Sequence, residues 1–479
     1  MNTSRLQVAG LLSFAACLLF YGSAKARAES DNPSVTAAAL ANDVRAETLR
    51  TWQAYVKYAW GHDELLPLTE SAHDWYGESI NIAPIDAYST LHLMGFTAET
   101  KRIEDFVVHD LSFNRESDVK VFEVNIRILG GLLYIYETTK NEQVLQKARD
   151  FADRLLPAFQ TPTGLPYFNV NLKTGATKGK IVNVAEAGSY IFEFGILSYY
   201  TGNPVYYQTA KKAVLKLHSL RSPLGLLGRD INVETGEWTM TQSMVGAYAD
   251  SYFEYLYKSW ILFQDPDLKE IWDTSIAAIQ RHIAEPRGKL LWYGKVDMNT
   301  GKKINSEVTL WDAYFPALLA LSGDLERAKQ SEAAWDFLWD QHGLIPMGYD
   351  YDKKIILNPY FQLNPEVIES AYYLWHYTGD QRYFNDVAKY YRNIKEHCRT
   401  EVAYCHIEDV RSMKQANEME TFFIAETLKY CFLTFDQGNP VSPQDFVFNT
   451  EAHPFRKSNF ERTKVAKNLG VHFAGAKQP

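Results

Sequence analysis

Several acidic residues of this 479-residue chain stand inside apolar helical stretches, where a charge needs a partner or a purpose. Glu123 and Arg127 are spaced i and i+4 within Phe122–Gly131, so both lie on one face of an otherwise apolar helix. Acidic residues hydrolyse glycosides in pairs, with one carboxyl protonated and the other ionised. The spacing fits such an acid, and it fits a simple intrahelical ion pair equally well.

A second candidate acid stands at a helix start. Asn364, Pro365 and Glu366 follow the order of an N-cap, a first helical proline and a first-turn acid. The helix dipole favours an ionised carboxylate at that place, which is the form that a general base requires. Glu369 follows one turn later. Because acids are common in first turns, the pattern by itself favours a structural role.

Two further acids share a helix with a neighbouring group. Asp250 has Glu254 at i+4, and we expect Glu254 to support the helix. Phe422 and Glu426 are also i and i+4, so a ring and a carboxylate project together. Sugars stack their apolar faces on aromatic rings while acids hold their hydroxyls, so this pair is a candidate floor for a sugar subsite. Periodicity alone favours Phe422 as a core residue.

The stretches Phe448–Pro454 and Phe422–Tyr430 resemble the closing signature of the class I α-mannosidases, glycoside hydrolase family 47. Further matching stretches extend this resemblance over roughly Trp52 to Pro454. The resemblance implies an all-α fold, an (αα)7 barrel formed by a toroid of helical hairpins, with β-hairpin or loop insertions on one face.

The resemblance also implies a role for each candidate residue. Glu123 matches the proton donor, and Arg127 would contact substrate or orient that carboxylate. Glu366 matches the catalytic base, whereas Asp250 either relays a proton through water or is itself the base. Glu186 matches a substrate contact.

Thr450 would bind Ca²⁺ through its carbonyl and hydroxyl oxygens, as the resemblance implies. Calcium prefers many oxygen ligands, including water, so nearby acids are expected to act through water molecules. These acids are Glu366, Glu369, Glu426 and Glu451. The chain has no EF-hand loop, so the calcium prediction depends wholly on the resemblance.

The chain departs from the family pattern near the outer subsites. Asn364 and Tyr248 stand where family members usually carry arginines that hold outer sugars, and Thr309–Tyr314 lacks the usual Asp-His pair. We therefore expect the reaction class to be kept, while the outer subsites and the preferred glycan differ.

A recurring phrase marks the ends of apolar helical stretches: Tyr136–Asn141, Tyr200–Pro204, Leu321–Asp324 and Tyr377–Asp380. Glycine supplies the left-handed residue that ends one helix, and Asn or Asp caps the next. The unit is an αα-hairpin, and successive hairpins must bury their apolar stripes against each other, in a closed ring or an open solenoid. Long insertions at Thr161–Lys180 and Asp230–Gln242 are expected to form β-hairpins or functional loops.

Four segments are expected along the chain. Residues 1–28 have the charge, apolar run and small-residue cleavage site of a secretory signal. A linker at 29–44 and a catalytic domain at 45–455 follow, and 456–479 is expected to be a disordered basic tail. The mature chain has no Asn-x-Ser/Thr acceptor site, which favours a bacterial exported protein, periplasmic or secreted.

The formal net charge of −9 argues against nucleic acid as a partner. Once the signal is cleaved, no stable membrane insertion is expected. Cys398, Cys405 and Cys431 lack a metal-ligand spacing, and the sequence does not decide whether Cys398 and Cys405 form a disulfide. Neither the oligomeric state nor the natural glycan follows from the sequence.

The leading hypothesis is a calcium-dependent exo-α-1,2-mannosidase that inverts configuration and acts on α-mannoside oligosaccharides. Its acid and base carboxylates should stand about 6.5 to 9.5 Å apart, because a water molecule lies between base and sugar. The alternative is a lectin-like protein that binds mannose glycans with little turnover. A third possibility is a toroidal hydrolase or epimerase for another sugar, against which the Thr450 motif argues.

Overall fold

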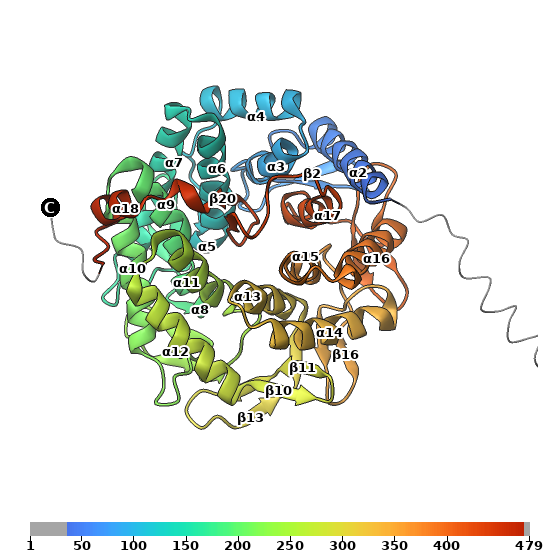
Figure 1. Cartoon of the computed structure of the whole chain (residues 1–479). Helices are drawn as coiled ribbons and strands as arrows, with labels where there is room; N and C mark the ends of the chain where they lie inside the picture. The colour runs from blue at the N-terminus through green and yellow to red at the C-terminus, as the bar shows by residue number, and fades with distance from the viewer. Residues whose placement is uncertain (1–35, 474–479) are drawn as a thin grey trace, which may run out of the picture.

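A computed structural model describes residues 36–473, and these residues form a ring of helices around a central opening (Figure 1). Inner helices line the ring and outer helices cover it, so the architecture is an α/α barrel. The predicted signal at 1–28 lies outside the described residues.

The inner helices are buried on nearly all sides, because their sequences are apolar throughout. Ile191–Tyr199 of α9 is an example, since each of its residues is buried. The inner elements are α3 (Ile82–Leu93), α5 (Val121–Val124), η1 (Asn125–Leu129), α6 (Gly130–Thr139), α9 (Ile191–Thr201), α11 (Asp250–Phe263), α13 (Phe315–Leu321), α15 (Glu366–Thr378), η4 (Phe423–Thr427) and α17 (Leu428–Phe435).

The outer helices are amphipathic, with an apolar stripe against the inner ring and charges toward solvent. All but α2 pack on an inner helix next to them in sequence, as α7 does on α6 and α16 on α15. The outer elements are α2 (Ala37–Tyr58), α4 (Thr97–His109), α7 (Glu142–Leu155), α10 (Val205–Ser219), α12 (Pro266–His282), α14 (Leu325–His342) and α16 (Gln381–Cys398). Shorter helices are η2 (Leu156–Phe159), α8 (Val184–Gly188), η3 (Leu310–Tyr314), η5 (Lys457–Asn459) and α18 (Arg462–Leu469).

The ring closes where the two ends of the chain meet. Helix α17 packs against α2, and η4 packs against α3. The Thr90 hydroxyl donates to the Ala425 carbonyl at 3.1 Å across this junction. Closure therefore places the first helix of the ring, α2, beside the last inner helix, α17 (Figure 1).

The predicted helix-ending turns are confirmed. Gly202 and Gly379 take left-handed conformations, with φ of +73° and +69°, and end α9 and α15. Lys140 takes the same conformation at the end of α6, with φ of +52°. Asn141 and Asp380 then accept backbone N–H groups at the next helix starts.

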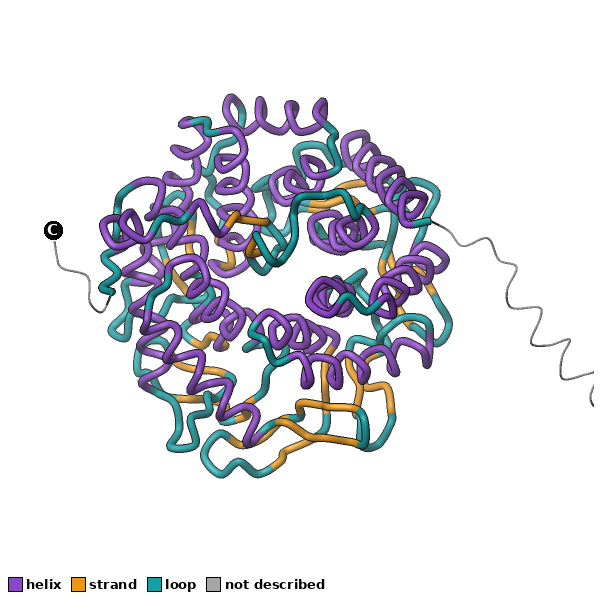
Figure 2. Tube along the Cα trace, viewed as in Figure 1, coloured by secondary structure: helices purple, strands orange, loops and turns teal. Residues whose placement is uncertain are grey.

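Short antiparallel strands connect the helices and extend beyond the ring (Figure 2). The predicted insertions contain strands β4–β5 and β7–β8 and are confirmed as β-hairpins. The pairs and three-stranded sheets are β1 (Glu64–Leu66) with β2 (Ser71–His73); β3 (Asp118–Lys120), β4 (Asn169–Asn171) and β5 (Thr177–Lys178); β6 (Ile181–Asn183), β7 (Asp230–Asn232) and β8 (Trp238–Met240); β13 (Lys303–Asn305), β12 (Lys295–Asp297) and β9 (Gln242–Ser243); β10 (Ala284–Arg287) with β11 (Leu290–Tyr293); β14 (Glu307–Thr309), β15 (Gly348–Asp350) and β16 (Ile355–Asn358); β17 (His406–Asp409) with β18 (Lys414–Ala416); and β19 (Phe446–Phe448) with β20 (Pro454–Arg456).

The expected boundaries at both ends need correction. Helix α2 already begins at Ala37, inside the segment expected as a linker. The expected disordered tail is wrong for its described part, because α18 packs against α9. Phe460, Val465 and Leu469 supply the buried apolar contacts, while the basic side chains that suggested a tail lie between them.

Cys398, Cys405 and Cys431 are buried free thiols. The backbone N–H of Cys405 donates to the Cys398 carbonyl at 2.8 Å, so these two residues are neighbours without a disulfide in this structure. Among residues 36–473, no helix has the length and apolar character needed to cross a membrane.

Candidate active site

The predicted site residues meet in one pocket inside the ring, although they come from segments far apart in the sequence. The pocket has a volume of about 150 Å³. Its lining includes nine of the predicted residues: Glu123, Arg127, Asp250, Glu366, Glu369, Phe422, Glu426, Thr450 and Glu451.

Glu123 lies in α5, two residues before the start of the π-helix η1, where the helix widens. Arg127 Nη2 donates to Glu123 Oε2 at 3.2 Å, and Lys120 Nζ lies 3.7 Å from Oε1. The predicted pair is therefore present, and two cations contact the Glu123 carboxylate. Widened π-turns occur often at functional sites, and a second one, η4, holds Glu426.

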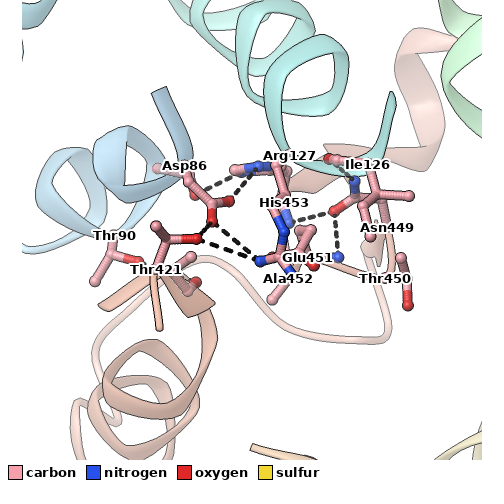
Figure 3. A network of polar contacts seen from close by, with 12 residues as sticks. Asp86, Thr90, Ile126, Arg127, Thr421, Asn449, Thr450, Glu451, Ala452 and His453 are labelled. Carbon is pink, nitrogen blue, oxygen red and sulfur yellow. Dashed lines mark hydrogen bonds and ion pairs between the residues drawn. The ribbon is translucent and has the colours of Figure 1, made fainter. Parts of the chain in front are cut away.

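Arg127 is anchored by a buried network that sequence reasoning missed (Figure 3). Its Nη1 donates to Glu451 Oε2 at 2.7 Å and to Asp86 Oδ2 at 3.4 Å. The hydroxyl of Thr421 donates to the same Asp86 oxygen. Asp86 is fully buried in α3. The only signal for it in the sequence was an acidic residue inside an apolar run. The network fixes the guanidinium that contacts Glu123.

Aromatic rings enclose the same guanidinium. Its central carbon lies 5.2 Å from the ring centroid of Trp75 and 5.8 Å from that of Phe422. Phe422 is half-buried and lines the pocket, so the core alternative is wrong. Trp75 was missed because it lies in a loop without helical periodicity.

Glu366 is the first residue of α15, and its helix start differs from the predicted one by one residue. Pro365 takes the N-cap position, and the Asn364 side chain instead donates to Glu366 Oε1 at 3.3 Å. The other oxygen, Oε2, is buried without a partner among the described residues. Burial raises the pKa of Glu366 to about 8, and the charges of Glu369 and Asp250 add to the shift. Burial therefore outweighs the expected helix-dipole effect.

Asp250 begins α11, and burial raises the pKa of its carboxyl to about 7, with added effects of Glu254 and Asp312. Glu254 does more than support the helix, because it lines the pocket and pairs with buried Lys258. Lys258 also lies 3.8 Å from Glu369 and so holds two acids. Burial raises the pKa of Glu369 to about 7 even so.

Thr450 stands in a tight loop between β19 and β20. The Asn449 side chain accepts the backbone N–H groups of Glu451 and His453 at 3.1 and 2.8 Å and donates to the Ile126 carbonyl at 3.1 Å (Figure 3). The Ala452 carbonyl accepts from buried Lys429 at 2.6 Å. These bonds fix the loop that presents Thr450 to the pocket.

The donor set fits a hard cation such as Ca²⁺. Thr450 and the four acids expected to act through water line one pocket, and Glu366 Oε2 has no hydrogen-bond partner among residues 36–473. Burial and the charges of Glu451 and Glu366 raise the pKa of Glu426 well above its usual value. No group of three or more His, Cys, Asp or Glu residues within 36–473 converges closely enough to hold a metal. Binding through Thr450 and water molecules requires no such group.

Glu186 is the one predicted residue that does not line the inner pocket. Its carboxylate accepts the Asn183 backbone N–H at 3.1 Å, and Asn183 in return accepts the Glu186 N–H, which forms a capping box at α8. Burial raises the pKa of Glu186, and its neighbours Glu123 and Asp230 raise it further. Glu186 does not line the pocket.

The pocket opens into a wider outer cleft of about 720 Å³. The inner pocket and the outer cleft share four lining residues: Glu123, Arg127, Trp311 and Phe422. Apart from Glu186, which lines neither space, the other predicted acids, including Asp250 and Glu366, line only the inner pocket. Glu123 therefore stands at the junction between a small enclosed space and a large open one.

The family model described as "Glycosyl hydrolase family 47" matches residues 47–457, which is most of the chain. The chain belongs to this family. It is therefore a glycoside hydrolase, as the acid-lined pocket indicates. The family expectation from the sequence motifs is confirmed.

Relatives of this family 47 member include the ER degradation-enhancing α-mannosidase-like protein 1 of Schizosaccharomyces pombe, 35% identical over 443 residues. That match covers 87% of this chain and 56% of the relative, so the chain spans little more than half of it. The human mannosyl-oligosaccharide 1,2-α-mannosidase IB is 33% identical over 88% of this chain and 70% of its own length.

Among solved structures, an α-1,2-mannosidase from Trichoderma reesei matches with a TM-score of 0.80 and 27% identity, over 87% of this chain and 98% of that one. A cellobiose 2-epimerase from Spirochaeta thermophila matches over 67% of this chain and 87% of that one, with a TM-score of 0.54 and 10% identity, and shares the fold alone. The named mannosidase relatives are eukaryotic and do not support the expected bacterial origin.

Proposed function

We propose that this family 47 hydrolase is a calcium-dependent exo-α-1,2-mannosidase that inverts configuration and releases terminal mannose from high-mannose-type glycans. The family assignment and the α-1,2-mannosidase relatives support the α-mannosidase activity. The observation that carries the proposal is the position of Glu123 at the junction of the inner pocket and the outer cleft.

This position suits a proton donor in an exo-acting enzyme. A terminal sugar in the inner pocket and the rest of the glycan in the outer cleft would place the bond between them beside Glu123. Protonation of that oxygen by Glu123 lets the leaving sugar depart. Lys120 Nζ and Arg127 Nη2 lie 3.7 and 3.2 Å from the Glu123 carboxylate and hold it at this junction.

The base belongs on the other side of the sugar ring. Asp250 and Glu366 line only the inner pocket, where either carboxylate would activate a water molecule for attack from the opposite face. The choice between Asp250 and Glu366 as the catalytic base stays open, as it does in the sequence analysis. Two carboxyls separated by a sugar and a water molecule are the arrangement of an inverting enzyme.

Calcium would be held by Thr450 directly and by Glu366, Glu369, Glu426 and Glu451 through water. A bound dication would favour the ionised carboxylates and orient the sugar hydroxyls. The protein itself supplies the fixed Thr450 loop, the anchored Arg127 and the enclosed acids.

The proposal extends to architecture and location. The paired inner and outer helices support seven hairpins in the barrel. Export to a periplasm or cell exterior rests on the predicted signal alone. We propose α-mannoside oligosaccharides as substrates and no nucleic-acid partner, given the formal charge of −9.

The test is mannose release from α-1,2-linked mannobiose with calcium. We expect Glu123→Gln to lower kcat about 10²- to 10⁴-fold, because it removes the proton donor. The control is Glu326→Gln, the same change at a side chain that is 84% exposed on outer helix α14. Proton NMR of the first product should show β-mannose. A folded wild type that binds mannobiose without releasing mannose would favour the lectin alternative.

A further inference from the structure

Cys398 and Cys405 lie opposite each other in a tight hairpin at the end of outer helix α16. Between them, Arg399 and Tyr404 form an antiparallel β-bridge. The two cysteines are the next pair outward, and the Cys405 N–H donates to the Cys398 carbonyl at 2.8 Å. Opposed residues of a hydrogen-bonded antiparallel pair have Cα atoms about 5.5 Å apart. This separation is within the range of about 4.4–6.8 Å that disulfides require, so the backbone already holds the cysteines at bridging distance.

Both thiols are shut off from solvent, since each cysteine is 0% exposed. Burial raises the pKa of the Cys405 thiol to about 12 and that of Cys398 well above its usual value. The thiolate is the form that exchanges with disulfides, so these thiols react slowly once the protein is folded. A bond between them must therefore form while the hairpin is still accessible, and burial would then protect it from reductants.

The hairpin between the cysteines docks on α2, the first helix of the ring. Glu47 of α2 accepts from Arg399 Nε at 3.0 Å and from the Tyr404 hydroxyl at 3.1 Å. Arg50 of the same helix donates to the Ala403 carbonyl at 3.1 Å. These groups all belong to the short loop that a bond between the cysteines would close. A covalent closure would therefore fix the surface on which the start of the ring packs.

We propose that Cys398 and Cys405 are a modification site, where a disulfide forms during folding and fastens this hairpin against α2. The oxidant is a disulfide compound such as oxidised glutathione. The two cysteine thiols lose two electrons and two protons as the S–S bond forms, and the oxidant takes both and becomes two thiols. The proposal is independent of the mannosidase function. Disulfides persist in oxidising compartments, so the bond suits an exported protein.

Peptide mapping tests the bond directly. The full chain is unfolded, reduced and refolded with oxidised and reduced glutathione, and the free thiols are then alkylated in denaturant. Trypsin cuts after Arg399, between the two cysteines, and so separates residues 396–399 from residues 400–411. Without reductant we expect these peptides as one linked species, with their summed mass less two hydrogen atoms. Cys431, which lies inside α17, should be alkylated. Alkylated separate peptides, or linkage of either cysteine to another one, would overturn the proposal.

Thermal unfolding tests whether the bond fastens the hairpin. The melting temperature of the refolded wild type should fall about 2–5 °C when a reductant is present, because the unfolded chain regains the freedom of the loop. The double variant Cys398→Ala, Cys405→Ala should melt at one temperature with and without reductant. Cys431→Ala is the matched control and should keep the wild-type response. A wild type with the linked peptides but no response to reductant would overturn the fastening role.

Discussion

Replacing Glu366 by glutamine should change how the stability of the calcium-free protein depends on pH. The pKa of Glu366 rises from 4.5 to about 8 on folding, mainly because the carboxyl is buried. The folded protein therefore keeps a proton between pH 4.5 and 8 that the unfolded chain has released. Within this window the free energy of unfolding falls as pH rises, and below it the contribution is fully present.

The expected size follows from the same shift. One group that titrates in this way lowers the free energy of unfolding by about 1.4 kcal/mol per pH unit. Between pH 5 and 7.5 the wild type should lose about 3 kcal/mol relative to Glu366→Gln, since glutamine does not titrate. Acids and histidines far from Glu366 change both proteins alike, so the difference reports Glu366 together with the acids that it touches electrostatically, Asp250, Glu369 and Glu426.

Urea unfolding of both proteins at several pH values, with a calcium chelator present, measures this difference. Glu326→Gln is the control, because that side chain is 84% exposed and its substitution should leave the pH dependence unchanged. If the free energies of unfolding of the wild type and of Glu366→Gln change equally with pH from 5 to 7.5, the raised pKa of a buried Glu366 carboxyl is refuted. Excess calcium should flatten the wild-type curve, because a cation favours the ionised form.

Three further outcomes are expected. Thr450→Ala should weaken calcium binding about tenfold in calorimetry, because a hydroxyl oxygen is lost, and an unchanged affinity would remove Thr450 from the calcium site. Lys258→Met should lower the free energy of unfolding by about 3–5 kcal/mol in urea, because two buried carboxylates lose their partner; the exposed Lys101→Met should cost less than about 1 kcal/mol, and equal costs would contradict the buried pairing. Leu469→Ala should cost about 2–5 kcal/mol if α18 is docked, whereas the exposed Leu215→Ala should cost little, and equal effects would argue for a loose C-terminal segment.

The sequence by itself determined the local features of this protein. Apolar runs that end in Gly202 and Gly379 specify helical hairpins, because glycine alone accepts a positive φ without strain. The positions of Glu123, Glu366 and Thr450 were evident from motifs, since those motifs are short and contiguous.

Only the tertiary structure decided how the candidate residues act. Asp86 lies far from Arg127 in sequence, and ring closure makes it a partner of that guanidinium. Glu186 was expected to contact substrate, and only the folded structure shows that its carboxylate also takes part in the capping box of α8. The sequence favoured an ionised Glu366, whereas the folded structure raises the pKa of its carboxyl, for the same kind of reason. A pKa depends on burial and on charges from distant segments, and neither exists until the chain is folded.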